Sequence, residues 1–156
     1  MSHDILGLRL VNQHLGGKRL SSPEALVSWL GAVQAQEFAM AKWALALRLP
    51  NTPTDAAIDD TFNRGAILRT HVLRPTWHFV APADLRWMLQ LSAPRILAAM
   101  ARRHRELAID DDLVKRARRV IVKALTGGRF FTRDELSAAL GGARLAEAAA
   151  KPGAGQ

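Results

Sequence analysis

One stretch of the chain, AILRTHVLRPTWHFV at positions 66–80, has a periodicity that a helix does not explain. It is rich in β-branched and aromatic residues, and side chains of different polarity alternate along residues 67–73. Alternation with a period of two is the pattern of a strand with one buried face. Arg-Pro-Thr at 74–76 indicates a turn, because proline has no N–H to give to a β-ladder. The sequence therefore predicts a two-stranded hairpin formed by residues 67–73 and 76–80.

Helical spacing precedes this hairpin. Apolar residues recur at helical intervals in four segments, residues 4–15, 21–33, 37–48 and 54–65. The second helix has two alternative starts: a capping box from Ser21 to Glu24, or Ser22 as the N-cap with Pro23 in the first turn. On this spacing the whole of residues 30–45 continues as an apolar helical run.

Helical spacing also follows the hairpin. Helices are predicted over residues 84–91, 94–106, 110–125 and 132–140, the last opened by a capping box from Thr132 to Glu135. Helices followed by a small β-hairpin are the order of elements in a winged helix. From residue 110 the pattern restarts, but a third helix and a second wing do not follow. The predicted fold class is therefore mainly α: a winged helix followed by an incomplete second winged-helix unit.

Three segments follow from this interpretation. Residues 1–92 form the first winged-helix unit, residues 93–140 a linker helix with a partial second unit, and residues 141–156 a small, polar tail that we expect to be disordered. The apolar face of residues 110–140 would lack a third helix to cover it. We expect that face to be buried either in a homodimer or by docking onto the first unit.

The charge of the chain points to an anionic partner. Lys and Arg number 22 against 14 Asp and Glu, which gives a formal net charge of +8, and such a balance favours nucleic acid. The sequence predicts no membrane span, since no long uncharged apolar run is present. It also has no secretory signal and no cysteine. These features fit a cytoplasmic protein.

Basic residues concentrate between positions 102 and 123. Those proposed to contact phosphates are Arg102, Arg103, Lys115, Arg119 and Lys123. The last three share one helix face by i, i+4 spacing. An equally open alternative is that they form a solvated outer face.

The hairpin carries further candidates. Arg69 and Arg74 flank it and are predicted to reach a DNA minor groove from the wing. His71 and His78 are placed to pair across the turn, but no carboxylate partner accompanies them, so no metal site is expected. The four tryptophans are expected to lie in the core.

Two segments together resemble a known family. AVQAQEFAMAKWALALR at 32–48 and ILRTHVLRPTWHFVAPADLRWMLQLSAPR at 67–95 are similar to the bacterial winged-helix DNA glycosylases of interstrand-crosslink repair and their uncharacterised winged-helix DNA-binding relatives. The resemblance covers about residues 5–140. Family members carry three tandem winged-helix units, so the resemblance implies that this chain corresponds to the N-terminal part and is truncated.

The resemblance implies a role for Gln34 and Gln36. A Gln-x-Gln motif is the catalytic element of that family. The enzymes of the family excise alkylated or crosslinked bases, such as N7-alkylpurines, from double-stranded DNA and need no cofactor. An N7-alkylated purine already bears a positive charge, so it leaves without a strong general acid. An amide that both donates and accepts hydrogen bonds can then orient a water molecule.

Helical geometry conflicts with this role. Residues two apart on a straight helix point roughly 200° away from each other. Both glutamines can face one substrate only if the backbone turns at residues 34–36, which Gly31 would permit. The alternative is that one glutamine caps a helix end while the other is solvated.

Three functions therefore remain open from the sequence. The chain is a DNA glycosylase that hydrolyses N-glycosyl bonds, or a winged-helix module that binds DNA without chemistry, or a fragment with no independent function.

Overall fold

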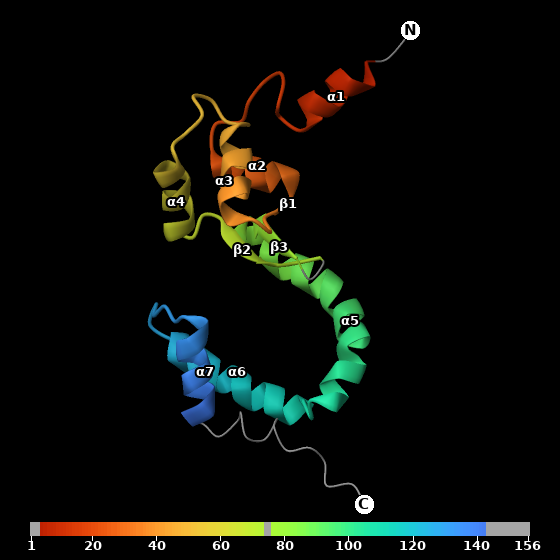
Figure 1. Cartoon of the computed structure of the whole chain (residues 1–156), viewed down its shortest axis with the longest axis vertical. Coiled ribbons are helices and arrows are strands. Elements are labelled where there is room, and N and C mark those ends of the chain that lie inside the picture. The colour runs from red at the N-terminus through yellow and green to blue at the C-terminus, as the bar shows by residue number, and fades with distance from the viewer. Residues whose placement is uncertain (1–3, 74–75, 143–156) are drawn as a thin grey trace, which may run out of the picture. The chain divides into compact units, whose positions relative to one another are not determined.

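A computed structural model describes residues 4–73 and 76–142, and helices predominate in them. The chain divides into two compact units, residues 1–94 and 95–156. In chain order the elements are α1 (Ile5–Asn12), α2 (Pro23–Leu30), β1 (Ala32–Gln34), α3 (Phe38–Ala46), α4 (Asp55–Asn63), β2 (Leu68–His71), β3 (Trp77–Val80), α5 (Pro82–Glu106), α6 (Asp111–Leu125) and α7 (Arg133–Gly142) (Figure 1). The prediction of a mainly α-helical chain with a small β-structure is confirmed.

The strands form an antiparallel three-stranded sheet in the order β1-β3-β2. The predicted hairpin is present as β2 and β3, but β1 is a strand that the sequence analysis placed inside a helix. Gly31 is the physical reason for the difference. It ends α2 with a φ of 77°, a conformation that glycine adopts without steric cost, and the chain leaves it extended. The element order and strand pairing are consistent with a winged-helix-like fold.

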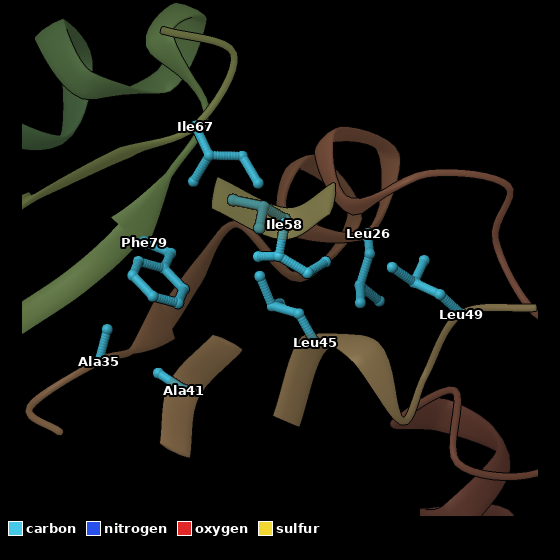
Figure 2. Packing of buried hydrophobic residues seen from close by; sticks show 9 residues of the cluster. Leu26, Ala35, Ala41, Leu45, Leu49, Ile58, Ile67 and Phe79 are labelled. Atoms are coloured by element: carbon cyan, nitrogen blue, oxygen red, sulfur yellow. The ribbon is translucent and has the colours of Figure 1, made fainter. Parts of the chain in front are cut away.

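The main core lies between α2, α3, α4 and one face of the sheet. Its fully buried members include Leu26, Leu45, Ile58 and Phe79, and Figure 2 shows them converging with Ala35. Phe38, Phe62 and Phe79 add a cluster of tilted and edge-to-face rings with centroids 4.8–5.9 Å apart. Ala41 of α3 is also buried in this core.

The opposite face of the sheet has its own, smaller core. Val72, Val80 and Met88 are buried there, and Ala32, Leu68 and Leu85 pack against them. Adjacent residues of a strand point to opposite faces. Val33 accordingly packs into the main core while its neighbour Ala32 packs into the smaller one. Both faces of this small sheet are thus partly covered by apolar side chains.

Local side-chain interactions fix the helices of the first unit. Ser22 is the N-cap of α2, with its Oγ accepting from the N–H of Ala25 at 3.2 Å, so the second of the two alternative starts is the one observed. Lys42 of α3 is buried and pairs with Asp55 at 2.8 Å and Asp59 at 2.7 Å, both in α4. Hydrogen bonds to these two carboxylates raise the pKa of Lys42 above its usual value. The ammonium group therefore stays charged and joins α3 to α4.

Helix α1 lies outside the main core of the first unit. The helices that enclose this core are α2, α3 and α4, whereas α1 has no buried residue although Ile5, Leu8 and Val11 lie along it. The expectation that the four tryptophans lie in the core is wrong: Trp29, Trp43 and Trp87 are about half exposed and Trp77 is 36% exposed.

The prediction of separate helices at 84–91 and 94–106 is also wrong, since α5 spans both. Pro94 removes one backbone hydrogen bond and disfavours a helix interior by about 3 kcal/mol, but it does not end this helix. Two residues before it, the hydroxyl of Ser92 donates to the carbonyl of Met88 at 2.8 Å.

In the second unit, α6 and α7 pack together. Asp110 caps α6 by accepting from the N–H of Leu113 at 2.7 Å. The predicted capping box of α7 is confirmed: Thr132 and Glu135 exchange hydrogen bonds, and the bonds donated by Thr132 hold the pKa of Glu135 below its usual value.

The apolar face of the second unit is only partly covered. Leu113 is buried, but Val114, Val122 and Leu125 are 38–56% exposed and Phe130 is 95% exposed. Self-association through residues 110–140, or their docking onto the first unit, stays a prediction. Most of the tail expected to be disordered, residues 143–156, lies outside the described residues.

Candidate active site

The segment Gln34–Ala35–Gln36 is not helical: β1 ends at Gln34, and a bend at Gln36 and Glu37 leads into α3. Ala35 is fully buried in the main core, whereas Gln34 and Gln36 are exposed. Because adjacent residues of a strand point to opposite faces, Gln34 lies on the side opposite Val33, and the straight-helix geometry that would separate the two glutamines does not apply here. The expectation that residues 30–45 form one helical run is therefore wrong at residues 32–36.

Pairing with β3 continues past the end of β1. The N–H of Ala35 donates to the carbonyl of Trp77 at 2.7 Å, and the N–H of Trp77 makes a long hydrogen bond of 3.4 Å to Oε1 of Gln36. The amide of Gln36 thus completes a strand pairing. Neither glutamine caps α3, whose N-cap Glu37 makes no side-chain cap bond.

Arg69 of β2 fixes the backbone of the same segment. Its Nε donates to the carbonyl of Ala35 and its Nη2 to the carbonyl of Gln36, each at 3.1 Å. A planar guanidinium holds its donors in a rigid fork that matches two neighbouring acceptors, whereas the donors of an ammonium all lie on one nitrogen. The two carbonyls at the end of β1 are therefore held by one side chain from a strand that does not pair with β1.

Two aromatic rings hold the guanidinium in turn. Its carbon lies 4.5 Å from the ring centroid of Trp77 and 5.3 Å from that of Phe38. Both distances lie within the range of cation–π attraction. Trp77 also stacks edge-on against His71, with centroids 4.1 Å apart. Arg69 is thus committed to intramolecular contacts, and a minor-groove contact by it stays a prediction.

A hollow of about 390 Å³ follows the outer side of β1. Its lining residues are Gln13, Leu30, Ala32, Val33, Gln34, Ala44, Leu45 and Arg48. Arg48 forms one wall and is held by the carbonyls of Gln13 at 2.9 Å and Ala44 at 2.6 Å. Since β1 is an edge strand, the hollow combines an apolar floor with unpaired strand backbone and the amide of Gln34, the mixture typical of a ligand site.

The basic residues of the second unit have separate partners. Arg102 and Arg103 both pair with Glu106, and Lys115 pairs with Asp112 at 3.4 Å. Lys115, Arg119 and Lys123 border one hollow along α6 together with Arg118, Val122 and Thr126. The helix therefore presents a row of cations, as the i, i+4 spacing predicted, although no phosphate contact is tested by this observation.

The remaining predicted residues divide as follows. Arg74 lies outside the described residues. His71 and His78 do not pair: the register sets Trp77 opposite His71 and Thr70 opposite His78. Among residues 4–73 and 76–142 no three His, Cys, Asp or Glu side chains are grouped as a metal site requires. None of the helices in those residues combines the length and apolar character needed to cross a membrane.

The sequence analysis missed the contacts that organise this site. Arg69 was assigned to DNA alone and Arg48 received no role. Arg69 is a charged residue on the sheet face that carries core residues: Val33, Phe79 and Arg69 align across the three strands. That position is the feature that could have indicated an intramolecular role for Arg69. A cation on a mostly apolar face is stable only where hydrogen-bond acceptors or aromatic rings lie nearby, because an unpaired buried charge costs free energy.

Comparison with known proteins adds the family. The family model described as DNA glycosylase AlkZ-like matches residues 27–155, which is most of the chain and contains Gln34, Gln36, Arg69 and α6. The chain belongs to the AlkZ-like DNA glycosylase family. Among curated proteins and among solved structures nothing matches it. The match indicates that this AlkZ-like chain is a relative of DNA-repair glycosylases, and the family implies DNA as the substrate.

A substitution at Arg69 tests how the glutamine segment is held. Arg69→Lys keeps the charge but replaces the planar fork of donors with a single nitrogen on a differently shaped side chain, which matches the two carbonyls less well, so we expect faster hydrogen exchange at the Ala35 amide. The expected loss is about 1–2 kcal/mol of local opening free energy, the scale of a charged hydrogen bond in a half-exposed site.

Arg86→Lys, on the exposed side of α5, is the matched control and should leave exchange at Ala35 unchanged. Equal exchange rates at Ala35 in both variants would contradict the role given to Arg69.

Proposed function

We propose that this chain is a DNA glycosylase that excises N7-alkylated purines from double-stranded DNA through Gln34 and Gln36, on a winged-helix scaffold. The observation that carries the proposal is the non-helical segment at 34–36, in which Gln34 and Gln36 are both exposed while Ala35 is buried in the core. Membership of the AlkZ-like family supports DNA as the substrate.

The chemistry requires little from the protein beyond positioning. The C1′–N9 bond breaks, its electron pair leaves with the cationic purine and neutralises it, and water adds to C1′. An amide has an acceptor oxygen and two donors, so Gln34 orients the water and stabilises the charge that develops on the sugar. Because an amide does not titrate near neutral pH, this contribution is independent of protonation. The gain comes from dipoles fixed before the reaction starts.

The two glutamines have different freedom in this arrangement. Oε1 of Gln36 receives the N–H of Trp77, while Gln34 lies beside the hollow along β1. We assign the water to Gln34. The N–H of Trp77 binds Oε1 of Gln36 and so orients this amide. The NH₂ group of Gln36 is then the part that we assign to the substrate.

Binding to duplex DNA is assigned to the basic residues. Arg119 and Lys123 on α6, with Lys115, Arg102 and Arg103, supply a sequence-independent attraction to phosphates. The second candidate function, a winged-helix module without chemistry, would use the same cations and leave the glutamines without effect.

Base release decides between these functions. With a duplex that contains N7-methylguanine under single-turnover conditions, we expect wild-type chain to release the free base. Gln34→Ala should slow the release by about 10²–10³-fold, the loss typical of removing one preorganised group, with DNA affinity unchanged.

Gln90→Ala, at an exposed position of α5, is the matched control and should react at the wild-type rate. Duplex binding without release of the base by wild-type chain would refute the enzyme and leave the binding module.

Salt dependence tests the phosphate contacts. We expect non-specific affinity with a Kd of about 10⁻⁴–10⁻⁶ M that weakens with salt, and a slope of log K against log salt that falls by about 2 in Arg119→Ala/Lys123→Ala, since each contact contributes roughly 0.9.

Arg9→Ala, on α1 and outside the matched residues, should leave that slope unchanged. Affinity that ignores salt, or an equal slope in the double variant, would remove α6 from the DNA interface.

A further inference from the structure

A polar row crosses the sheet beside Gln34. The register sets Gln34 of β1 opposite His78 of β3, and His78 opposite Thr70 of β2. Two residues along each strand, the same face carries Ala32, Val80 and Leu68, which pack in the smaller core. The face therefore changes from apolar to polar at the end where the glutamine segment lies.

The pairing pattern brings Gln34 and His78 close together. In an antiparallel ladder, hydrogen-bonded pairs alternate with non-hydrogen-bonded pairs, and side chains approach most closely in the latter. Ala35 donates to Trp77, so the neighbouring Gln34–His78 pair is of the non-hydrogen-bonded kind. Cβ atoms of such a pair lie about 4.5–5.5 Å apart, which suits two polar groups that share one water molecule.

The ring of His78 is held in one orientation. The residue is only 5% exposed, and its Nδ1 lies 2.8 Å from the carbonyl oxygen of Thr76. A carbonyl only accepts, so Nδ1 must carry the proton in this bond. In the neutral imidazole Nε2 is then the unprotonated nitrogen, and it is a hydrogen-bond acceptor.

We propose that His78 is a catalytic residue: its Nε2 accepts a hydrogen bond from the attacking water that Gln34 orients. This inference rests on the proposed glycosylase function and adds a proton acceptor to it. As water oxygen bonds to C1′, the electron pair of the C1′–N9 bond leaves with the purine. The surplus proton of the water passes to Nε2 and then to bulk solvent, so Nε2 returns to its neutral form.

Two isosteric variants separate catalysis from structure. His78→Asn retains a donor near Nδ1 for the Thr76 carbonyl but has no group at Nε2, whereas His78→Gln places an amide near Nε2. With the N7-methylguanine duplex in single turnover, we expect His78→Asn to be about 10²-fold slower, the lower range for general base catalysis. We expect its Tm and DNA affinity to be unchanged, and His78→Gln to recover part of the rate.

A double-mutant cycle with Gln34→Ala measures whether the two rate losses are coupled, which a purely structural role of His78 would not produce. If both side chains act on one water, Gln34→Ala/His78→Asn is no slower than the slower single variant. Should His78→Asn unfold, His78→Phe, which keeps the ring volume without an acceptor, takes its place in the cycle.

The outcomes separate the two proposals. If wild type and His78→Asn release base at the same rate, or if the two losses multiply, the glycosylase function stands and the role of His78 is overturned. If wild type releases no base, both proposals are overturned together.

Discussion

The pairing of β1 with β3 is the interaction on which the candidate site depends. A positive φ at Gly31 releases the chain from α2, and the following residues pair with β3 instead of continuing the helix. That single change of backbone state places Ala35 in the core and leaves Gln34 and Gln36 exposed. The guanidinium of Arg69 then binds the carbonyls of Ala35 and Gln36 just beyond the end of the strand. Without β1, Gln34 would not lie opposite His78.

The electrostatics of the site suit a cationic leaving group. The guanidinium of Arg69 contacts backbone carbonyls and aromatic faces. It therefore holds residues 35 and 36 in place and is not assigned to the substrate. The groups assigned to the substrate, Gln34 and Gln36, are neutral amides. Neutral dipoles that are fixed in advance stabilise developing charge without the desolvation cost of an ion, which is what the departure of an already charged purine requires. A row of positive charge is carried by α6 in the second unit, and this is where we propose that the phosphate backbone binds.

Sequence periodicity predicted elements whose signals are local. The hairpin, the caps at Ser22 and Thr132 and the amphipathic helix α6 follow from propensity, capping chemistry and spacing, and each was confirmed. β1 was missed because three residues between two helices are too few to show a period of two, and its strand state is set by pairing with β3, far along the chain. The continuity of α5 through Pro94 and the exposure of α1 also differ from what local spacing and proline alone indicate. The glutamines were found through a family resemblance, whereas the contacts of Arg69 and the register of His78 required the fold itself.

The central claim is that residues 32–34 form a strand paired with β3, that Ala35 continues this pairing, and that Gln34 lies opposite His78. In a non-hydrogen-bonded antiparallel pair the two α-protons lie close together, so nuclear Overhauser spectroscopy of the isotope-labelled chain tests this claim most directly. We predict a strong cross-strand contact between the α-protons of Gln34 and His78. The absence of that contact, together with the sequential amide contacts of a helix through residues 30–38, would contradict the account.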